Sequence, residues 1–197
     1  MSLYNAEISA GSLLLPESRR VAGLMLTHPN QQIWFQALRL DNILQKKSPA
    51  TARRQARLIR NRLETLDEAA WPMVAAGEQE VALQILLAAA IKHSRLLGDF
   101  LRDVVAGRLR RLERTLSPGD WEAFLADCAH RDPAVATWST TTRAKLLQVI
   151  LRMLAEARYL ESTSSLVLTP PLLHPEVRSF LHSHREAAVL AAMELTS

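Results

Sequence analysis

The clearest hydrophobic periodicity in this chain begins at residue 48. Small or apolar residues recur at spacings of four, three, four and three at Ala52, Ala56, Ile59, Leu63 and Leu66. This spacing predicts an amphipathic helix with one buried stripe, because an α-helix repeats every 3.6 residues. Ser48 is a favourable N-cap and Pro49 suits the first helical position, so we expect the helix to begin there.

Similar patterns divide the rest of the chain into short helices. Before residue 48, the pattern predicts helices at 17–27 and 31–44, separated by the turn His28-Pro29-Asn30. Beyond residue 72, the predicted helical segments are 78–91, 95–116 with a break at Gly98 or Gly107, 118–130, 133–138, a helix capped by residues 139–142, a helix from Pro175, and 186–195. In the helix that follows residue 142, the predicted inward face is Ala144, Leu147, Ile150, Leu151 and Leu154.

These elements predict an all-α fold with two small helical domains. Trp71-Pro72 and Gly77 interrupt the pattern, so we place a boundary between a domain at 1–72 and a domain at 73–197. The three helices of the first domain predict a helix-turn-helix arrangement. In the second domain, the segment between Leu160 and Leu168 is compatible with a short β-hairpin, which would give a winged-helix-like unit.

Composition supports a packed helical protein. Hydrophobic residues make up 48% of the chain, aromatic residues only 5%, and there are 6 glycines. The single Cys128 excludes an internal disulfide, and the N-terminus lacks the features of a signal peptide, so we expect a cytoplasmic protein. The longest apolar run, 81–91, is far shorter than the roughly 20 residues that a membrane span requires, and no span is expected.

Positive charge is concentrated in the segment that contains the predicted helix at residue 48. Between Asp41 and Glu64 there are seven Lys and Arg residues and no acidic residue, whereas the whole chain has 24 Lys and Arg against 20 Asp and Glu. Without these seven residues the net charge of +4 would become negative. Such a local excess is typical of nucleic-acid binders, because each phosphate that a cation neutralises releases a counterion.

The helical periodicity also assigns these cations to sides of the helix. Arg54, Arg57 and Asn61 lie opposite the buried stripe, Arg53 and Arg60 flank them, and Arg62 lies near the buried margin. We expect Arg53, Arg54, Arg57 and Asn61 to face a duplex, and Lys46, Lys47 and Arg60 to contact phosphates. With about five phosphate contacts, the logarithm of the binding constant should fall with the logarithm of salt concentration at a slope near −4 to −5. The predicted DNA-binding residues are Lys46, Lys47, Ser48, Thr51, Arg53, Arg54, Arg57, Arg60 and Asn61.

Simpler interpretations of these charges remain open. The basic helix could be a solvated surface, although such surfaces usually interleave acidic residues at i, i+4. The cluster Arg108, Arg110, Arg111 and Arg114 has nearby acidic residues, so a solvated or inter-helix role is the better interpretation. Arg143, Lys145 and Arg152 are candidates for a second DNA-contact surface. Phosphate-binding loops, catalytic triads and metal-ligand patterns are missing from the sequence, so neither enzymatic activity nor a cofactor or metal is expected.

Three segments of the chain resemble the BrxA family of the BREX bacteriophage-exclusion defence systems. They are Tyr4-Asn5-Ala6-Glu7-Ile8-Ser9-Ala10-Gly11, then Glu17-Ser18-Arg19 with Val21-Ala22, and then Ser48-Pro49-Ala50-Thr51 followed by Arg53, Arg57, Leu58-Ile59-Arg60 and Arg62-Leu63. The resemblance implies a small all-helical cytoplasmic protein that binds double-stranded DNA. It also implies that the protein functions together with larger BREX components, among them a methyltransferase and ATPases.

Two other functions compete with duplex binding. The chain could be an adaptor subunit that docks a larger BREX component through the same basic surface, or through its apolar middle helices, without binding DNA itself. RNA binding through a helical bundle is a third possibility.

Overall fold

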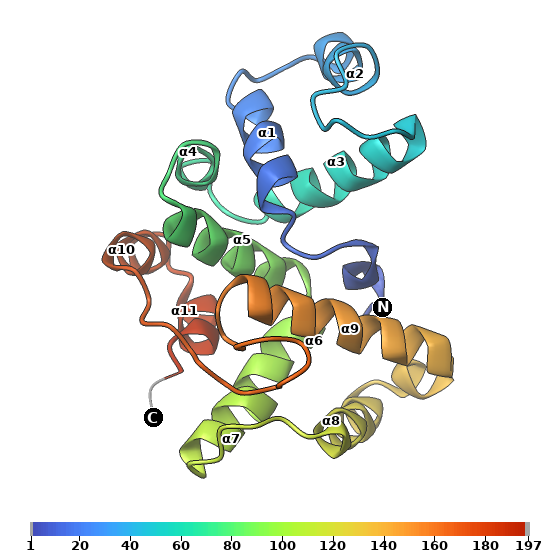
Figure 1. Cartoon of the computed structure of the whole chain (residues 1–197), viewed down its shortest axis with the longest axis vertical. Helices are drawn as coiled ribbons and strands as arrows, with labels where there is room; N and C mark the ends of the chain where they lie inside the picture. Colours follow the sequence, from blue (N-terminus) through green and yellow to red (C-terminus); the bar gives the residue numbers. More distant parts are fainter. Residues whose placement is uncertain (1, 196–197) are drawn as a thin grey trace.

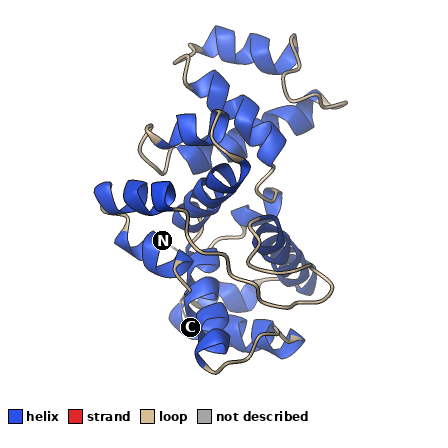
Figure 2. Ribbon diagram, turned by 60° about the vertical axis from the view of Figure 1, so that its left-hand side comes forward, coloured by secondary structure: helices blue, strands red, loops and turns tan. Residues whose placement is uncertain are grey.

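The computed structural model describes residues 2–195, and this part of the chain is all-α, without a β-strand (Figure 2). The helices in chain order are η1 (Glu7–Ala10), α1 (Leu15–Met25), α2 (Gln31–Arg39), α3 (Pro49–Leu63), α4 (Ala70–Ala75), α5 (Gln79–His93), α6 (Arg95–Asp99), η2 (Phe100–Val105), α7 (Ala106–Arg110), α8 (Pro118–Arg131), η3 (Pro133–Thr137), α9 (Thr140–Glu156), α10 (Pro175–Ser183) and α11 (Ala187–Met193). The predicted fold class is therefore confirmed.

The helices form a layered arrangement around α5 (Figure 1). Helices α1, α2 and α3 lie at one end of the molecule, and α4 packs between α1 and α5. Helix α5 is buried along almost its whole length, from Val81 to Ile91, as its unbroken apolar sequence predicts. The long helix α9 packs against η1 near the N-terminus.

The predicted start of α3 is confirmed, but α2 is shorter than expected. The Ser48 hydroxyl accepts a hydrogen bond from the Thr51 amide at 3.4 Å, and Pro49 follows in the first turn. Helix α2 ends at Arg39 instead of Leu44, because Asn42 adopts a left-handed conformation with φ of 44°. Its side-chain amide both accepts from and donates to the Lys46 backbone, which closes the loop before α3.

The connection between α2 and α3 spans residues 40–48, whereas the turn of a helix-turn-helix motif usually has 3–4 residues. The helix-turn-helix assignment stays a prediction. The two-domain division also stays a prediction. Trp71-Pro72 does not end a helix but lies in the first turn of α4, where proline costs no backbone hydrogen bond. Gly77 follows α4 because an added Cβ would lie 2.2 Å from the Met73 carbonyl oxygen.

The predicted helix at 95–116 ends at Arg110, and its interruption takes an unexpected form. A π-helical segment, η2, lies between Gly98 and Gly107 and separates α6 from α7. Within residues 2–195 we find no single helix with the length and apolarity of a membrane span. The pair formed by 79–93 and 95–110 meets those criteria jointly, but bends by 110°.

Of two expectations in the second half, one is wrong and one holds in part. The segment at 160–168 is not a β-hairpin but a loop with two isolated bridges, Leu160 to Leu168 and Val167 to Thr115, so the described residues form no wing of two strands. In α9 the predicted Ile150 and Leu154 are buried, Leu147 and Leu151 are half-buried and Ala144 is exposed, and the buried face is completed by Leu146, Val149 and Met153. Apolar residues cover more than one side of α9, so periodicity alone could not fix which side packs inward.

Candidate nucleic-acid interface

Helix α3 buries the predicted stripe and exposes its basic side. Ala52, Ala56, Ile59, Leu63 and Leu66 are all buried. On the opposite side, Arg53, Arg54, Arg57, Arg60 and Asn61 are exposed to solvent. The structure therefore brings most of the predicted DNA-binding residues together on one helix face, near the end of the molecule formed by α1–α3 (Figure 1).

The exposed side of α3 is a ridge between two grooves. One groove, of about 460 Å³, lies between α2 and α3 and includes Arg53, Arg57, Arg60 and Asn61 in its lining. The other, of about 410 Å³, lies on the side of η1 and the end of α5, and its lining includes Arg54, Arg57, Asn61 and His93. Arg57 and Asn61 line both grooves, so they form the crest of the ridge. An exposed basic helix face with a hollow on each side is compatible with an element that enters a major groove.

Not every predicted cation is equally free to meet a phosphate. Lys46 is half-buried, and its ammonium pairs with Glu17 of α1. The Arg60 guanidinium pairs with Glu64 at 2.7 Å, and its Cζ also lies 4.9 Å from the centroid of the Trp34 ring. These two pairs are the ion pairs of the basic segment within residues 2–195, so Lys47, Arg53, Arg54 and Arg57 carry no carboxylate partner in that part of the chain. The loop before α3 therefore offers one unpaired cation, Lys47, instead of two.

Ser48 and Thr51 lie at the N-terminal end of α3. Ser48 is exposed and Thr51 half-buried, and the side chain of Ser48 is engaged with the Thr51 amide. Their clearest role in the structure is to begin the helix. The remaining free amides of the first turn add to the positive end of the helix beside Lys47.

Arg62 has a different role from the other arginines of α3. It is 3% exposed and donates to the carbonyl oxygens of Ser12 at 2.6 Å and Gly11 at 2.8 Å. Burial lowers the pKa of the guanidinium to about 10, so it stays charged at neutral pH. Arg62 thus fixes α3 to the N-terminal segment, in agreement with its predicted place at the buried margin.

The N-terminal segment is held by further contacts on both sides. Glu156 of α9 accepts from the Ser12 hydroxyl and the Leu13 amide, both at 2.8 Å. Arg54 of α3 donates to the Ala10 carbonyl oxygen at 2.9 Å. His93 lies at the end of α5, with its Nε2 atom 3.8 Å from a carboxylate oxygen of Glu7. Burial lowers the pKa of its imidazole most, and the positive charge of Arg62 lowers it further. The residues from Tyr4 to Gly11 that carry the family resemblance therefore fix the position of α3.

Sequence reasoning missed that α2 forms the far wall of one of the two grooves. Phe35 and Arg39 line the groove between α2 and α3, with Trp34 and Leu38 beside them. The Arg39 Cζ lies 5.2 Å from the centroid of the Phe35 ring. The signal in the sequence was the apolar character of α2 on more than one side, which a helix buried on one side only would not show.

The other cationic clusters differ in how far acidic residues neutralise them. Arg108 pairs with Asp120 at 2.6 Å and with Glu113 at 2.8 Å, which agrees with the inter-helix role expected for this cluster. Arg143 donates to the carbonyl oxygens of Trp138 and Ala136, and Lys145 donates to Gln148. Arg152 is exposed on α9. The second DNA-contact surface proposed for Arg143, Lys145 and Arg152 stays a prediction.

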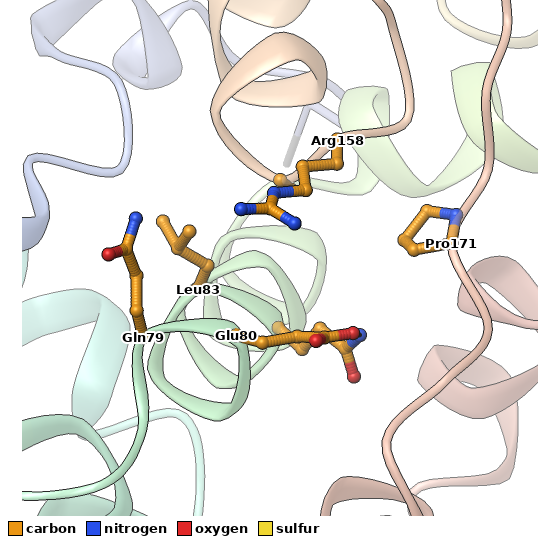
Figure 3. Close-up of a pocket in the computed structure, with 7 residues that line it drawn as sticks. Gln79, Glu80, Leu83, Arg158 and Pro171 are labelled. Atoms are coloured by element: carbon orange, nitrogen blue, oxygen red, sulfur yellow. The ribbon is translucent and has the colours of Figure 1, made fainter.

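Two hollows of similar size lie elsewhere, one of about 490 Å³ that includes Arg114 and Arg178 in its lining and one of about 400 Å³ that includes Lys92 and Arg102, and a third is much smaller. The one shown in Figure 3 lies between the first turns of α5 and the loop after α9, with the Arg158 side chain extending over Leu83. It holds about 10 Å³, which is room for a water molecule at most. Among residues 2–195, no group of three or more His, Cys, Asp and Glu side chains is placed to hold a metal ion.

Comparison with known proteins assigns the chain to a family. A family model described as BrxA matches residues 2–185. A protein of Paramagnetospirillum magneticum (strain ATCC 700264 / AMB-1) named BREX protein BrxA is 40% identical over 193 residues, which cover 98% of this chain and 97% of that protein. Another BREX protein BrxA, from Escherichia coli O9:H4 (strain HS), is 34% identical over 188 residues, with 95% of this chain and 88% of that protein covered.

A solved structure has the same fold. The crystal structure of an uncharacterized protein from Magnetospirillum magneticum matches with a TM-score of 0.90 and 39% identity, and covers 98% of this chain and 99% of that one. The family model, the relatives and this structure agree over nearly the whole length. The chain therefore belongs to the BrxA family.

Proposed function

We propose that this chain is a non-catalytic component of a BREX phage-defence system that binds double-stranded DNA through α3. Membership of the BrxA family supports the place in BREX. One observation supports the DNA partner above all others, namely the exposed ridge of α3 on which Arg53, Arg54 and Arg57 have no carboxylate partner within residues 2–195. A solvated helix face would pair such cations with acids at i, i+4, as Arg60 does with Glu64.

In this proposal the ridge enters the major groove, with Arg57 and Asn61 at its crest. Arg53 and Arg54 lie on its two sides, since each lines only one of the two flanking grooves. Arg53 and Arg54 therefore face the two phosphate backbones, while Lys47 and the first turn of α3 meet a phosphate at the helix end. Binding is mostly electrostatic, because phosphate contacts outnumber the side chains placed to reach bases.

The adaptor function is the alternative, and charge reversal separates the two. Arg53→Glu together with Arg57→Glu should abolish binding to a duplex in a salt-titrated mobility shift. If duplex binding is unchanged in this variant, α3 is not the DNA-binding helix. A duplex that fails to bind even the unmodified protein at low salt would favour the adaptor.

Competition between nucleic acids tests the class of ligand. Duplex DNA, single-stranded DNA and RNA of the same sequence are compared at two salt concentrations against one labelled duplex. The proposal expects duplex DNA to be the strongest competitor, since the spacing of phosphates across the major groove matches a single protruding helix. Stronger competition by RNA would favour RNA binding instead.

A further inference from the structure

The groove between α2 and α3 has an apolar wall from α2 as well as a basic wall from α3. Its floor includes Trp34, Phe35 and Leu38, and its volume is about 460 Å³. The α2 residues in the lining, at 31, 34, 35, 38 and 39, share one face of that helix. This face extends along two helical turns, which is the length over which an amphipathic helix presents its apolar anchors.

Helix α2 is also poorly covered by the rest of the protein. It packs mainly against α3, and Figure 1 shows it at the outer end of the molecule. Phe35 is 45% exposed, Ile33 49% and Leu40 72%. Phe35 lines the groove beside Trp34 and Leu38, whereas Ile33 and Leu40 lie on the other side of α2 and do not line it. A large exposed apolar side chain in a groove is typical of an interaction surface.

The charges around the groove define its occupant. Arg39, Arg53, Arg57 and Arg60 line it, while the single acidic residue of the lining, Glu64, already pairs with Arg60. A segment that fills this groove gains from carboxylates beside its apolar anchors. We propose that the groove between α2 and α3 docks an acidic amphipathic helix of a protein partner.

The ring faces of the groove favour a protein over an unpaired nucleic-acid strand. A base would need an open aromatic face on which to stack. The Arg60 guanidinium covers the Trp34 ring at 4.9 Å, and the Arg39 guanidinium lies 5.2 Å from the centre of the Phe35 ring.

Docking and DNA binding share side chains. Arg53, Arg57 and Arg60 line the groove and also belong to the surface proposed for duplex binding. A docked acidic helix therefore competes with DNA for these cations. This competition rests on the proposed function, whereas docking itself does not.

A synthetic peptide tests the proposal. The probe is a fluorescently labelled helix of about 15 residues, with Leu at i, i+3, i+4 and i+7 and Glu at most other positions. A scrambled peptide of equal composition is the control for charge alone. Binding is followed by fluorescence anisotropy and by the NMR signal of the Trp34 indole N–H, assigned by its loss in Trp34→Phe. The amphipathic peptide should bind and shift this signal, and the scrambled one should bind at least several-fold more weakly.

Matched variants locate the site on α2. Phe35→Ala should weaken peptide binding about tenfold, because apolar contact is lost. It should leave duplex binding within about twofold, because no phosphate-binding group is removed. Leu40→Ala, one residue beyond the end of α2 and outside the groove lining, should change neither peptide binding nor duplex binding. If Phe35→Ala fails to fold, Arg39→Glu replaces it. This variant should weaken peptide binding several-fold.

Each failure has a distinct meaning. Equal binding of the scrambled peptide, or peptide binding unaffected by Phe35→Ala, would overturn the docking proposal even if duplex DNA binds. If instead Phe35→Ala weakens the binding of an oligo(dT) strand and not the binding of the peptide, the groove is a nucleic-acid site and the docking proposal is wrong. Specific peptide binding by a protein that does not bind a duplex would support docking and contradict the proposed DNA binding.

Discussion

Neutralising two arginines of α3 should halve the salt dependence of duplex binding. The structure leaves Lys47, Arg53, Arg54 and Arg57 as exposed cations without a carboxylate partner in residues 2–195, since Lys46 pairs with Glu17 and Arg60 with Glu64. Arg57, at the crest of the ridge, neutralises phosphate charge from inside the groove and is counted with the other three. At about −0.9 per phosphate neutralised, these four cations give a slope near −3.6 for the logarithm of the binding constant against the logarithm of salt concentration. The double variant Arg53→Gln with Arg57→Gln should therefore show a slope near −1.8.

These slopes predict a large difference in an accessible range. Between 50 and 200 mM salt, affinity should fall roughly 150-fold for the unmodified protein and roughly 12-fold for the double variant. The assay is fluorescence anisotropy of a labelled duplex at five salt concentrations. Glutamine keeps the length of the side chain and much of its helix propensity, so the helix itself should be preserved.

A control variant separates local contacts from total charge. Arg110→Gln with Arg185→Gln removes the same charge from exposed positions on α7 and after α10, away from α3. Its slope should stay near −3.6, because these residues do not meet the duplex. Equal slopes for the α3 variant and the unmodified protein would refute the assignment of Arg53 and Arg57 to the surface that meets the duplex. Equal changes in both variants would show that net charge alone acts.

Three further predictions concern stability, each measured by urea denaturation. Ser48→Ala should cost roughly 0.5–1 kcal/mol, since it removes the N-cap bond at 3.4 Å, and should barely change the salt slope; a loss above this range would indicate a wider role. Arg62→Leu should cost roughly 2–4 kcal/mol because it leaves two buried carbonyl groups of the N-terminal segment unpaired; a loss near zero would contradict its anchoring role. Hydrogen bonds from the Ser2 hydroxyl and then the Tyr4 amide lower the pKa of Asp132 from 3.8 to about 2, so its stabilisation is present above pH 3.8 and disappears as pH falls through about 2. The difference in the free energy of unfolding between the unmodified protein and Asp132→Asn should therefore shrink as pH falls from 3.8 to about 2. A difference that stays constant over this range would contradict this pKa.

Local signals in the sequence were enough to predict α3. A serine cap, a proline in the first turn and a regular small-residue stripe all act within the helix, and tertiary contacts did not overrule them. The exposed positions of Arg53, Arg54, Arg57 and Asn61 followed from the same geometry. These features depend on neighbours in the sequence, which is why they could be predicted.

What the sequence could not show depends on contacts between distant segments. Lys46 looks like a free loop cation, but the fold brings Glu17 beside it from 29 positions earlier. The groove between α2 and α3 exists only because α2 ends at Arg39 and leaves Phe35 beside the arginines of α3. No periodicity reports such pairings, because they arise from how helices pack.

The arginines of α3 divide into an anchoring residue and a binding face, and this division explains how the basic segment can be stable. Arg62 places its charge inside the protein, where it is held by the Gly11 and Ser12 carbonyl oxygens and attracted by Glu156. Glu156 also binds Ser12 and Leu13, so the N-terminal segment ties α3 to α9 from both sides. An exposed cluster of like charges tends to push a helix out of place, since the repulsion is relieved when the charges separate. The buried anchor opposes this tendency and presents the outer arginines in a fixed orientation before any ligand arrives, which lowers the cost of ordering them when phosphates or carboxylates bind.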